Sequence, residues 1–202
     1  MNIPNAISLF RILSILPVAI LVSVNTLTSL YLALAIIIIS YLSDGIDGYI
    51  ARTYHQETTL GSILDILGDR TLEIGLWLIF ASVGIVPSIV GIIFIIRGSI
   101  TDTIRQINYG KNSSTPFSLS SSTFSKVIVS SRFSRLLYGV IKFATFCFAV
   151  YVLISRLNQS INFPIFLYYL QIMVWVTTIY NLVRGIPVII ESFGLLSNKR
   201  LV

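Results

Sequence analysis

The chain is poor in charged residues and has almost no cysteine. Only 11% of its 202 residues are charged and 55% are apolar, whereas soluble domains have about a quarter charged residues. A soluble fold of this size needs more polar surface than these side chains supply, which argues against a soluble globular protein. The single cysteine, Cys147, excludes an intramolecular disulfide and argues against a thiolate metal site.

The first residues lack the pattern of a cleavable signal peptide. Their polar start has no basic cluster, and Arg11 interrupts the apolar run that follows. We therefore expect a retained first helix that is preceded by an N-terminal interfacial segment.

Long apolar runs are what the chain has in abundance. Several are near or above the roughly 17–25 residues that cross a bilayer. Hydropathy therefore predicts an all-α, polytopic membrane protein, with residues 1–202 forming a single domain. A serine-rich polar stretch, residues 108–126, is expected to be a loop. Six transmembrane helices are expected near residues 7–24, 30–52, 60–83, 86–107, 133–154 and 163–190.

Basic residues gather on one side of these expected spans. If the N-terminus is cytoplasmic, the inner loops and inner helix ends contain every lysine and arginine except Arg156. This asymmetry predicts an integral protein of the cytoplasmic membrane with both termini in the cytoplasm. The net charge of +6 then suits an anionic inner leaflet and phosphate-bearing substrates, and it requires no nucleic acid.

Six of the eight acidic residues lie between Asp44 and Glu73. Asp44 and Asp47 are three residues apart at the inner end of the second span, and Asp65 and Asp69 are four apart at the start of the third. Each spacing places a pair on one helical face. Because only a short loop joins the two spans, we expect the helices to be antiparallel neighbours and the two pairs to face each other.

Four converging carboxylates repel one another unless cations offset their charge. Arg52 and Arg70 could neutralise two of them, and divalent cations, which prefer carboxylate oxygens, could neutralise more. Two cations held by shared carboxylates form the arrangement that clamps the oxygens in phosphoryl transfer. Gly45, Gly48 and Gly61 remove side chains beside the cluster, which leaves space for a ligand.

The segment from Asp44 to Asp69 resembles the signature of the CDP-alcohol phosphatidyltransferase family. That pattern is D-x-x-D-G-x-x-A-R, a spacer of eight or nine residues, and G-x-x-x-D-x-x-x-D, and every fixed position is filled here. The resemblance implies transfer of a phosphatidyl-type group from a CDP-linked lipid, such as CDP-diacylglycerol, to an alcohol, with release of CMP. Members of the family are often dimers, so a homodimer is expected.

The resemblance also implies roles for individual residues. Two ions, Mg²⁺ or Mn²⁺, would be held by Asp44, Asp47 and Asp65, with help from Asp69. Asp69 would be the catalytic base that takes the proton from the acceptor hydroxyl. The CDP portion would be seated by Gly48, Ala51, Arg52 and Gly61.

Cations within or beside the later spans indicate a phosphorylated acceptor, because charged groups at such places are usually functional. The candidates for binding the acceptor phosphate are Arg97, Arg105, Arg132, Arg135 and Lys142. Glu73 is expected either to pair with a basic residue or to orient a ligand. Asp102 is expected to pair with Arg105, three residues later.

Residues 2–12 and 97–105 resemble, by loose motifs, segments of the phosphatidylglycerophosphate synthases of this family, which makes glycerol 3-phosphate the expected acceptor. Two positions depart from those synthases: Gly98 stands where they usually have an acid, and Arg70 where they commonly have lysine. An Asp-Arg pair at that point resembles the inositol-phosphate branch. Inositol phosphate, serine or a second phospholipid therefore stay open as alternative acceptors.

Two other classes of membrane protein fit the sequence less well. A cation or proton transporter also has intramembrane acids, but it predicts acids spread through the bilayer depth, whereas these gather at one end of two adjacent spans. A non-catalytic membrane scaffold would be indicated by loss of a signature aspartate, and none is missing.

Overall fold

The chain forms antiparallel α-helices, which confirms the predicted all-α class. The computed structural model describes residues 3–53, 59–109 and 132–198, and within these ranges the regular elements are all helices. They are α1 (Ile3–Val24), α2 (Leu27–Thr53), α3 (Thr59–Ser82), α4 (Ser88–Tyr109), α6 (Arg132–Leu157) and α7 (Phe163–Asn198).

Most helices begin and end within a few residues of the expected spans. α1 starts at Ile3, so the expected interfacial segment is, from that residue on, part of the first helix. α7 was predicted to end near residue 190 but continues to Asn198, because one proline removes a single backbone donor and the apolar residues after it still favour a helix. The expected serine-rich loop lies outside the described residues, apart from Asn108 and Tyr109, which end α4.

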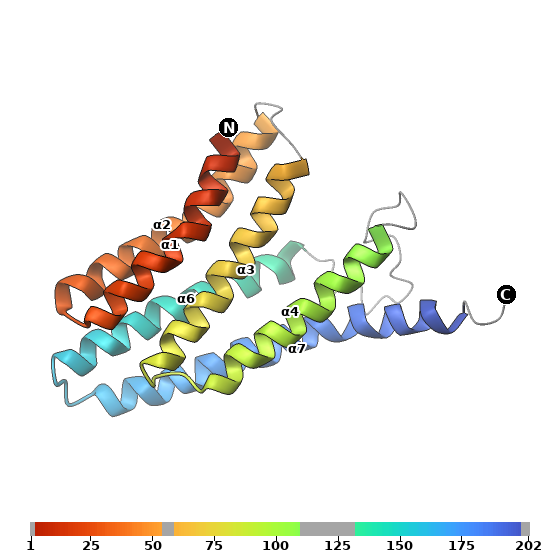
Figure 1. The fold of residues 1–202 in the computed structure, drawn as a ribbon. Helices are drawn as coiled ribbons and strands as arrows, with labels where there is room; N and C mark the ends of the chain where they lie inside the picture. The colour runs from red at the N-terminus through yellow and green to blue at the C-terminus, as the bar shows by residue number, and fades with distance from the viewer. Residues whose placement is uncertain (1–2, 54–58, 110–131, 199–202) are drawn as a thin grey trace.

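The six helices pack as a closed ring, in the order α1, α2, α6, α7, α4, α3 and back to α1. Figure 1 shows that the turns α1–α2, α3–α4 and α6–α7 lie toward one end of the bundle. The N-terminus, the C-terminal end of α4 and the start of α6 lie toward the other end. Successive helices run in opposite directions. The C-terminal ends of α2 and α4 and the N-terminal ends of α1, α3 and α6 therefore lie at the same end of the bundle.

Local sequence explains the sharp turn between α1 and α2. Asn25 adopts the left-handed conformation, with φ of 53°, which asparagine tolerates at the end of a helix. Thr26 Oγ1 then accepts a hydrogen bond from the Ser29 amide at 3.2 Å, and Ser29 Oγ accepts one from the Thr26 amide at 3.0 Å. This reciprocal cap satisfies two backbone donors at the start of α2.

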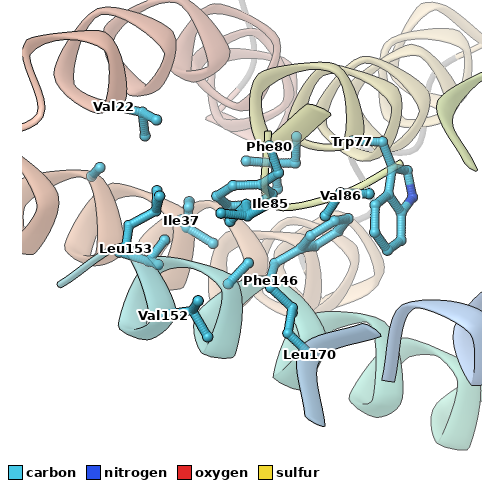
Figure 2. Packing of buried hydrophobic residues seen from close by; sticks show 14 of the residues in the cluster. Val22, Ile37, Trp77, Phe80, Ile85, Val86, Phe146, Val152, Leu153 and Leu170 are labelled. Atoms are coloured by element: carbon cyan, nitrogen blue, oxygen red, sulfur yellow. The ribbon is translucent and has the colours of Figure 1, made fainter. Parts of the chain in front are cut away.

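Aromatic side chains fill the middle of the ring. Trp77 and Phe80 of α3 meet Phe146 of α6, with ring centroids 4.7 Å and 6.1 Å apart, and Trp77 also contacts Phe94 of α4. Figure 2 shows Trp77, Phe80 and Phe146 together with aliphatic residues of α2, α6 and α7. This core fixes α3 against α4 and α6, the helices that present most of the charged groups described below.

The outer surface of the bundle is apolar, with exposed residues such as Leu16, Ile20, Leu136, Val140 and Ile179. Such a surface suits lipid rather than water. Four helices are long and apolar enough to cross a bilayer: α1, α2, α6 and α7. The prediction of six such spans is thus supported for four of the described helices, because α3 and α4 each combine several ionised residues with their apolar ones.

Candidate active site

Carboxylates from α2 and α3 converge on one arginine of α1. The Arg11 guanidinium forms an ion pair with Asp44 through Nη1, lies 2.6 Å from Asp65 Oδ1 through Nη2, and lies 3.6 Å from Asp69 Oδ1. Arg11 is fully buried, whereas the three aspartate side chains are about half exposed. The structure therefore brings three of the four signature aspartates together across the helix–helix contact; the side chain of Asp47 lies outside the described residues.

Arg11 was not among the residues predicted for this site. We expected Arg52 and Arg70 to neutralise the cluster, but Arg70 pairs elsewhere and the side chain of Arg52 is outside the described residues. The signal available in the sequence was a single arginine within an otherwise apolar first helix. Gly68 completes the arrangement, because a Cβ atom there would lie 2.7 Å from Arg11 Nε.

The donor chemistry of these aspartates fits a hard cation. Their oxygens share one cationic partner, and carboxylates are the ligands that Mg²⁺ and Mn²⁺ use. Among the described side chains no three acidic, histidine or cysteine residues are grouped closely enough to hold a metal by themselves. Arg11 supplies the positive charge at this point.

A cavity of about 670 Å³ opens beside the cluster. Asp44, Asp69 and Arg11 line one side of it, and apolar residues of α2, α3 and α6 contribute to the remainder. A second group of lining residues is basic and consists of Arg70, Arg97, Lys142 and Arg184. Because Arg11 pairs with the aspartates and Arg70 and Lys142 pair with Glu73, we call the two groups the acidic and the basic side of the cavity. Acidic and basic groups from all six described helices therefore face one space.

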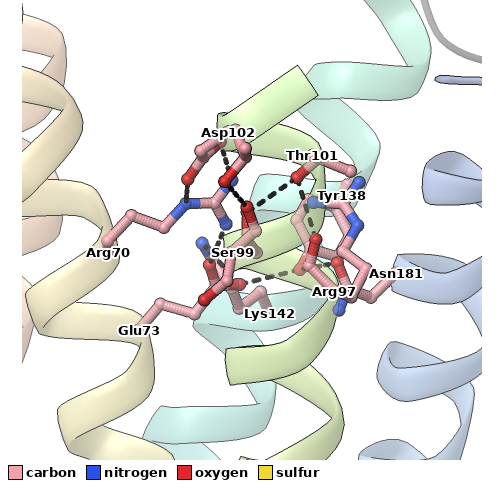
Figure 3. A network of polar contacts seen from close by, with 11 residues as sticks. Arg70, Glu73, Arg97, Ser99, Thr101, Asp102, Tyr138, Lys142 and Asn181 are labelled. Carbon is pink, nitrogen blue, oxygen red and sulfur yellow. Dashed lines mark hydrogen bonds and ion pairs between the residues drawn. The ribbon is translucent and has the colours of Figure 1, made fainter. Parts of the chain in front are cut away.

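Arg70 is held by an acid on the neighbouring helix. Its Nε lies 2.9 Å from Asp102 Oδ2 and its Nη2 lies 3.1 Å from Oδ1, a bidentate pair between α3 and α4 (Figure 3). Bidentate pairs fix the orientation of both side chains. We expected Asp102 to pair with Arg105; the structure shows its pair with Arg70, and the side chain of Arg105 lies outside the described residues.

Glu73 is the most buried acid of the network in Figure 3, with 4% of its surface exposed. Lys142 Nζ lies 3.2 Å from its Oε1, and Arg70 Nη1 lies 3.4 Å from its Oε2. The Tyr138 hydroxyl donates to Oε1 at 2.7 Å and also lies 3.2 Å from Asn181 Oδ1. Of the two alternatives predicted for Glu73, the structure shows the first, pairing with basic residues.

Of the predicted acceptor-binding residues, the structure places Arg97 and Lys142 at the cavity. The Nε of Arg97 is buried without a hydrogen-bond partner among the described residues. The side chains of Arg105, Arg132 and Arg135 lie outside the described residues.

The residues predicted to seat CDP lie on α2 and α3. The backbones of Gly48, Ala51 and Arg52 belong to the last turns of α2, where side chains are not described, and Gly61 lies in the first turn of α3. Sequence reasoning missed two cavity residues, Tyr138 and Arg184. An arginine on the inner half of the last span was the signal for the second.

A family model described as CDP-alcohol phosphatidyltransferase matches residues 1–183. The chain belongs to the CDP-alcohol phosphatidyltransferase family. It is therefore an enzyme of the predicted class, a transferase of substituted phosphate groups. The matched range includes the signature aspartates, Arg11, Arg97 and Lys142.

Curated relatives point in the same direction. The CDP-diacylglycerol–glycerol-3-phosphate 3-phosphatidyltransferase of Wigglesworthia glossinidia brevipalpis is 35% identical over 144 residues, which cover 67% of this chain and 77% of that protein. The Aquifex aeolicus protein of the same name is 42% identical over 35% of this chain and 38% of that protein. A Mycobacterium tuberculosis protein provisionally named cardiolipin synthase is 33% identical over 43% of this chain and 41% of its own length.

The two departures from the phosphatidylglycerophosphate synthase pattern contact each other in this CDP-alcohol phosphatidyltransferase. A Cβ atom at Gly98 would lie 3.6 Å from Arg70 Nη1. A longer side chain at that position would extend into the space of the guanidinium. The acid that pairs with Arg70, Asp102, stands one helical turn further along α4.

Proposed function

We propose that this enzyme transfers the phosphatidyl group of CDP-diacylglycerol to glycerol 3-phosphate and releases CMP. The observation that carries the proposal is the single cavity with two oppositely charged sides. Three aspartates against one arginine leave two negative charges in excess on one side. On the other side four cations stand against Glu73 and Asp102, which leaves two positive charges in excess.

Asp69 is the residue that fits the role of general base. It lines the acidic side of the cavity, on the same helix as Asp65, with its side chain half exposed. The acceptor hydroxyl would give its proton to the Asp69 carboxylate while its oxygen bonds to the lipid-bearing phosphorus. The bond from that phosphorus to the bridging oxygen breaks, and the electron pair leaves with CMP.

Asp44, Asp47, Asp65 and Asp69 would hold the Mg²⁺ or Mn²⁺ ions, two in number, that the family resemblance implies. When bound, such ions neutralise the diphosphate and make CMP a better leaving group. The half-exposed carboxylates at the end of the bundle suit an ion that enters from water. Gly48, Ala51, Arg52 and Gly61 would seat the cytidine diphosphate beside these aspartates.

The basic side of the cavity favours a phosphate monoester as acceptor. Such a group has about 1.5 to 2 negative charges near neutral pH. This charge matches the excess of two positive charges that the described residues leave on the basic side of the cavity. Arg97 adds a buried Nε that has no hydrogen-bond partner among those residues. A neutral alcohol or the single charge of a phosphodiester would leave part of this charge unbalanced. Inositol phosphate satisfies the same argument and is the alternative acceptor.

The membrane arrangement belongs to the same proposal. Residues 1–202 form one domain in which α3 and α4 also cross the bilayer, because most of their charged groups pair inside the bundle. The end of the bundle with the cavity faces the cytoplasm, where the basic residues gather. A homodimer is consistent with this plan and follows from the family resemblance alone.

A screen of radiolabelled acceptors tests the proposal. Purified protein in detergent is incubated with CDP-diacylglycerol, Mg²⁺ or Mn²⁺, and glycerol 3-phosphate, inositol phosphate or serine. The expected result is CMP release and labelled lipid with glycerol 3-phosphate, both abolished by a chelator. Incorporation of another alcohol alone overturns the acceptor and leaves the reaction class intact. Cation flux in reconstituted vesicles without CMP release would support the transporter instead.

A further inference from the structure

We propose that Glu73 is a positioning residue that arranges the cations of the cavity for the acceptor phosphate. This inference rests on the proposed function and adds a residue that the family signature does not include. Glu73 follows Asp69 by one helical turn, and it lies on the basic side of the cavity, where an acid by itself would repel an anionic ligand.

The direct contacts of Glu73 hold two of the four cations on the basic side of the cavity. Oε1 accepts from Lys142 at 3.2 Å and Oε2 faces Arg70 at 3.4 Å. Lys142 and Arg70 come from α6 and α3, so one carboxylate ties two flexible side chains of different helices together. Both side chains are largely buried, with 13% and 24% of their surface exposed. Their charged ends are thereby kept at the cavity rather than in the lipid head-group region.

Glu73 reaches a third cation through Tyr138. The Tyr138 hydroxyl donates to Glu73 at 2.7 Å, which fixes the ring. Arg184 of α7 then lies over that ring, with its guanidinium carbon 5.0 Å from the centroid, and Lys142 Nζ lies 5.3 Å from it. Cations at such distances are attracted to the face of an aromatic ring. One buried carboxylate therefore positions Lys142 directly and Arg184 through Tyr138, and it shares Arg70 with Asp102.

The competing interpretation makes the opposite prediction. If Glu73 acted only through its charge, removing that charge would strengthen anion binding, because the cavity would become more positive. If Glu73 positions the cations, removing its charge releases them and weakens binding. Glu73→Gln separates the two, since glutamine keeps the size of the side chain and removes only its charge.

The test measures affinity for glycerol 3-phosphate in two ways. The first is the KM of the acceptor at saturating CDP-diacylglycerol. The second is the rise in unfolding temperature that glycerol 3-phosphate causes without CDP-diacylglycerol, which needs no turnover. Glu73→Gln should raise the acceptor KM by about tenfold, since one charge-assisted contact contributes about that factor. It should shrink the thermal shift and leave the KM of CDP-diacylglycerol within about twofold.

Tyr138→Phe keeps the ring and removes the hydroxyl, so it should raise the acceptor KM by about threefold, the factor of a weak hydrogen bond. Adding it to Glu73→Gln should cost less than the two separate effects combined, because both act on the same contact. If Glu73→Gln does not fold, Glu73→Asp and Tyr138→Phe replace it. Both keep the negative charge at position 73 and disturb its contacts, so a positioning role predicts a higher acceptor KM and a pure charge effect predicts no change. An acceptor KM that stays unchanged or falls in the folded variants overturns the inference.

Thr177→Val is the matched structural control. Thr177 of α7 is buried and hydrogen-bonds to Thr145 of α6 at 3.0 Å, between helices that also meet at Tyr138 and Asn181. It should lower thermal stability without changing the acceptor KM. If it raises that KM as much as Glu73→Gln does, general loosening of the helices explains the effect and the positioning role is wrong. A wild-type enzyme that uses no phosphorylated acceptor would instead refute the proposed function itself.

Discussion

The two charged sides of the cavity are built in different ways. On the acidic side one buried arginine serves three half-exposed aspartates. On the basic side two carboxylates contact two of the four cations directly and a third through Tyr138, and these contacts are bidentate, shared or made through an aromatic ring. The first arrangement leaves carboxylate oxygens facing water, whereas the second uses its acids to fix the cations in place. The comparison teaches that the excess charge of the acidic side is accessible to ions from water, whereas the excess charge of the basic side is held in fixed positions.

Changing the base on the acidic side should have the largest effect. Asp69→Asn removes the proton acceptor and should reduce CMP release by about a thousandfold, within the range of lost general-base catalysis. The rate is measured with CDP-diacylglycerol and glycerol 3-phosphate. Asp102→Asn is the matched change on the basic side and should reduce the rate by less than about tenfold, since it loses one charged contact. Equal losses in both variants would contradict the division of roles.

On the basic side, Arg97→Gln should weaken acceptor binding. A hydrogen bond to a charged group contributes about 1.5–3 kcal/mol, which corresponds to a rise of roughly 10- to 100-fold in the acceptor KM. The KM of CDP-diacylglycerol should not change, because the aspartates proposed to act on that substrate contact Arg11, whereas Arg97 belongs to the basic group of lining residues. A change in both constants would show that the two sides do not bind separate substrates.

Arg11→Met sharpens the comparison without any turnover measurement. When a chelator keeps metal ions away, this substitution leaves the three aspartates without the Arg11 guanidinium, and the unfolding temperature should fall below that of the wild type. The loss should be below the roughly 3–5 kcal/mol of a fully buried pair, because these aspartates are half exposed. In buffer without chelator, added Mn²⁺ should raise the unfolding temperature of Arg11→Met by more than that of the wild type, since no guanidinium competes for the carboxylate oxygens. A smaller rise would show that Arg11 assists the metal instead.

Two glycines provide the smallest expected effects. A Cβ atom at Gly185 of α7 would lie 2.9 Å from Arg97 Nε, so Gly185→Ala should displace Arg97 and raise the acceptor KM by about threefold. Gly91→Ala of α4 is the control, because its Cβ would only make ordinary contact, at 3.5 Å, with Leu78. Its kinetic constants should match the wild type. Indistinguishable constants for both variants would show that Arg97 needs no space at α7.

The sequence by itself determined the helices and the acidic motif. Long apolar runs leave the backbone little choice but helix, and the spacing of Asp65 and Asp69 places both on one face whatever packs against it. The position of Glu73, one helical turn after Asp69, could be predicted from the sequence in the same way. These properties are local, because a helix repeats every few residues.

Only the tertiary structure decided which charges meet. Arg11 lies 33 residues from Asp44 in sequence and Arg70 lies 32 from Asp102, yet each pair is in contact. Arg52, Arg70 and Arg105 were equally plausible partners in sequence terms. The rotation of each helix is set by the packing of its apolar faces, such as Trp77 against Phe146, and that packing depends on helices that are far apart in the chain. The partners of the charged residues therefore follow from the fold as a whole.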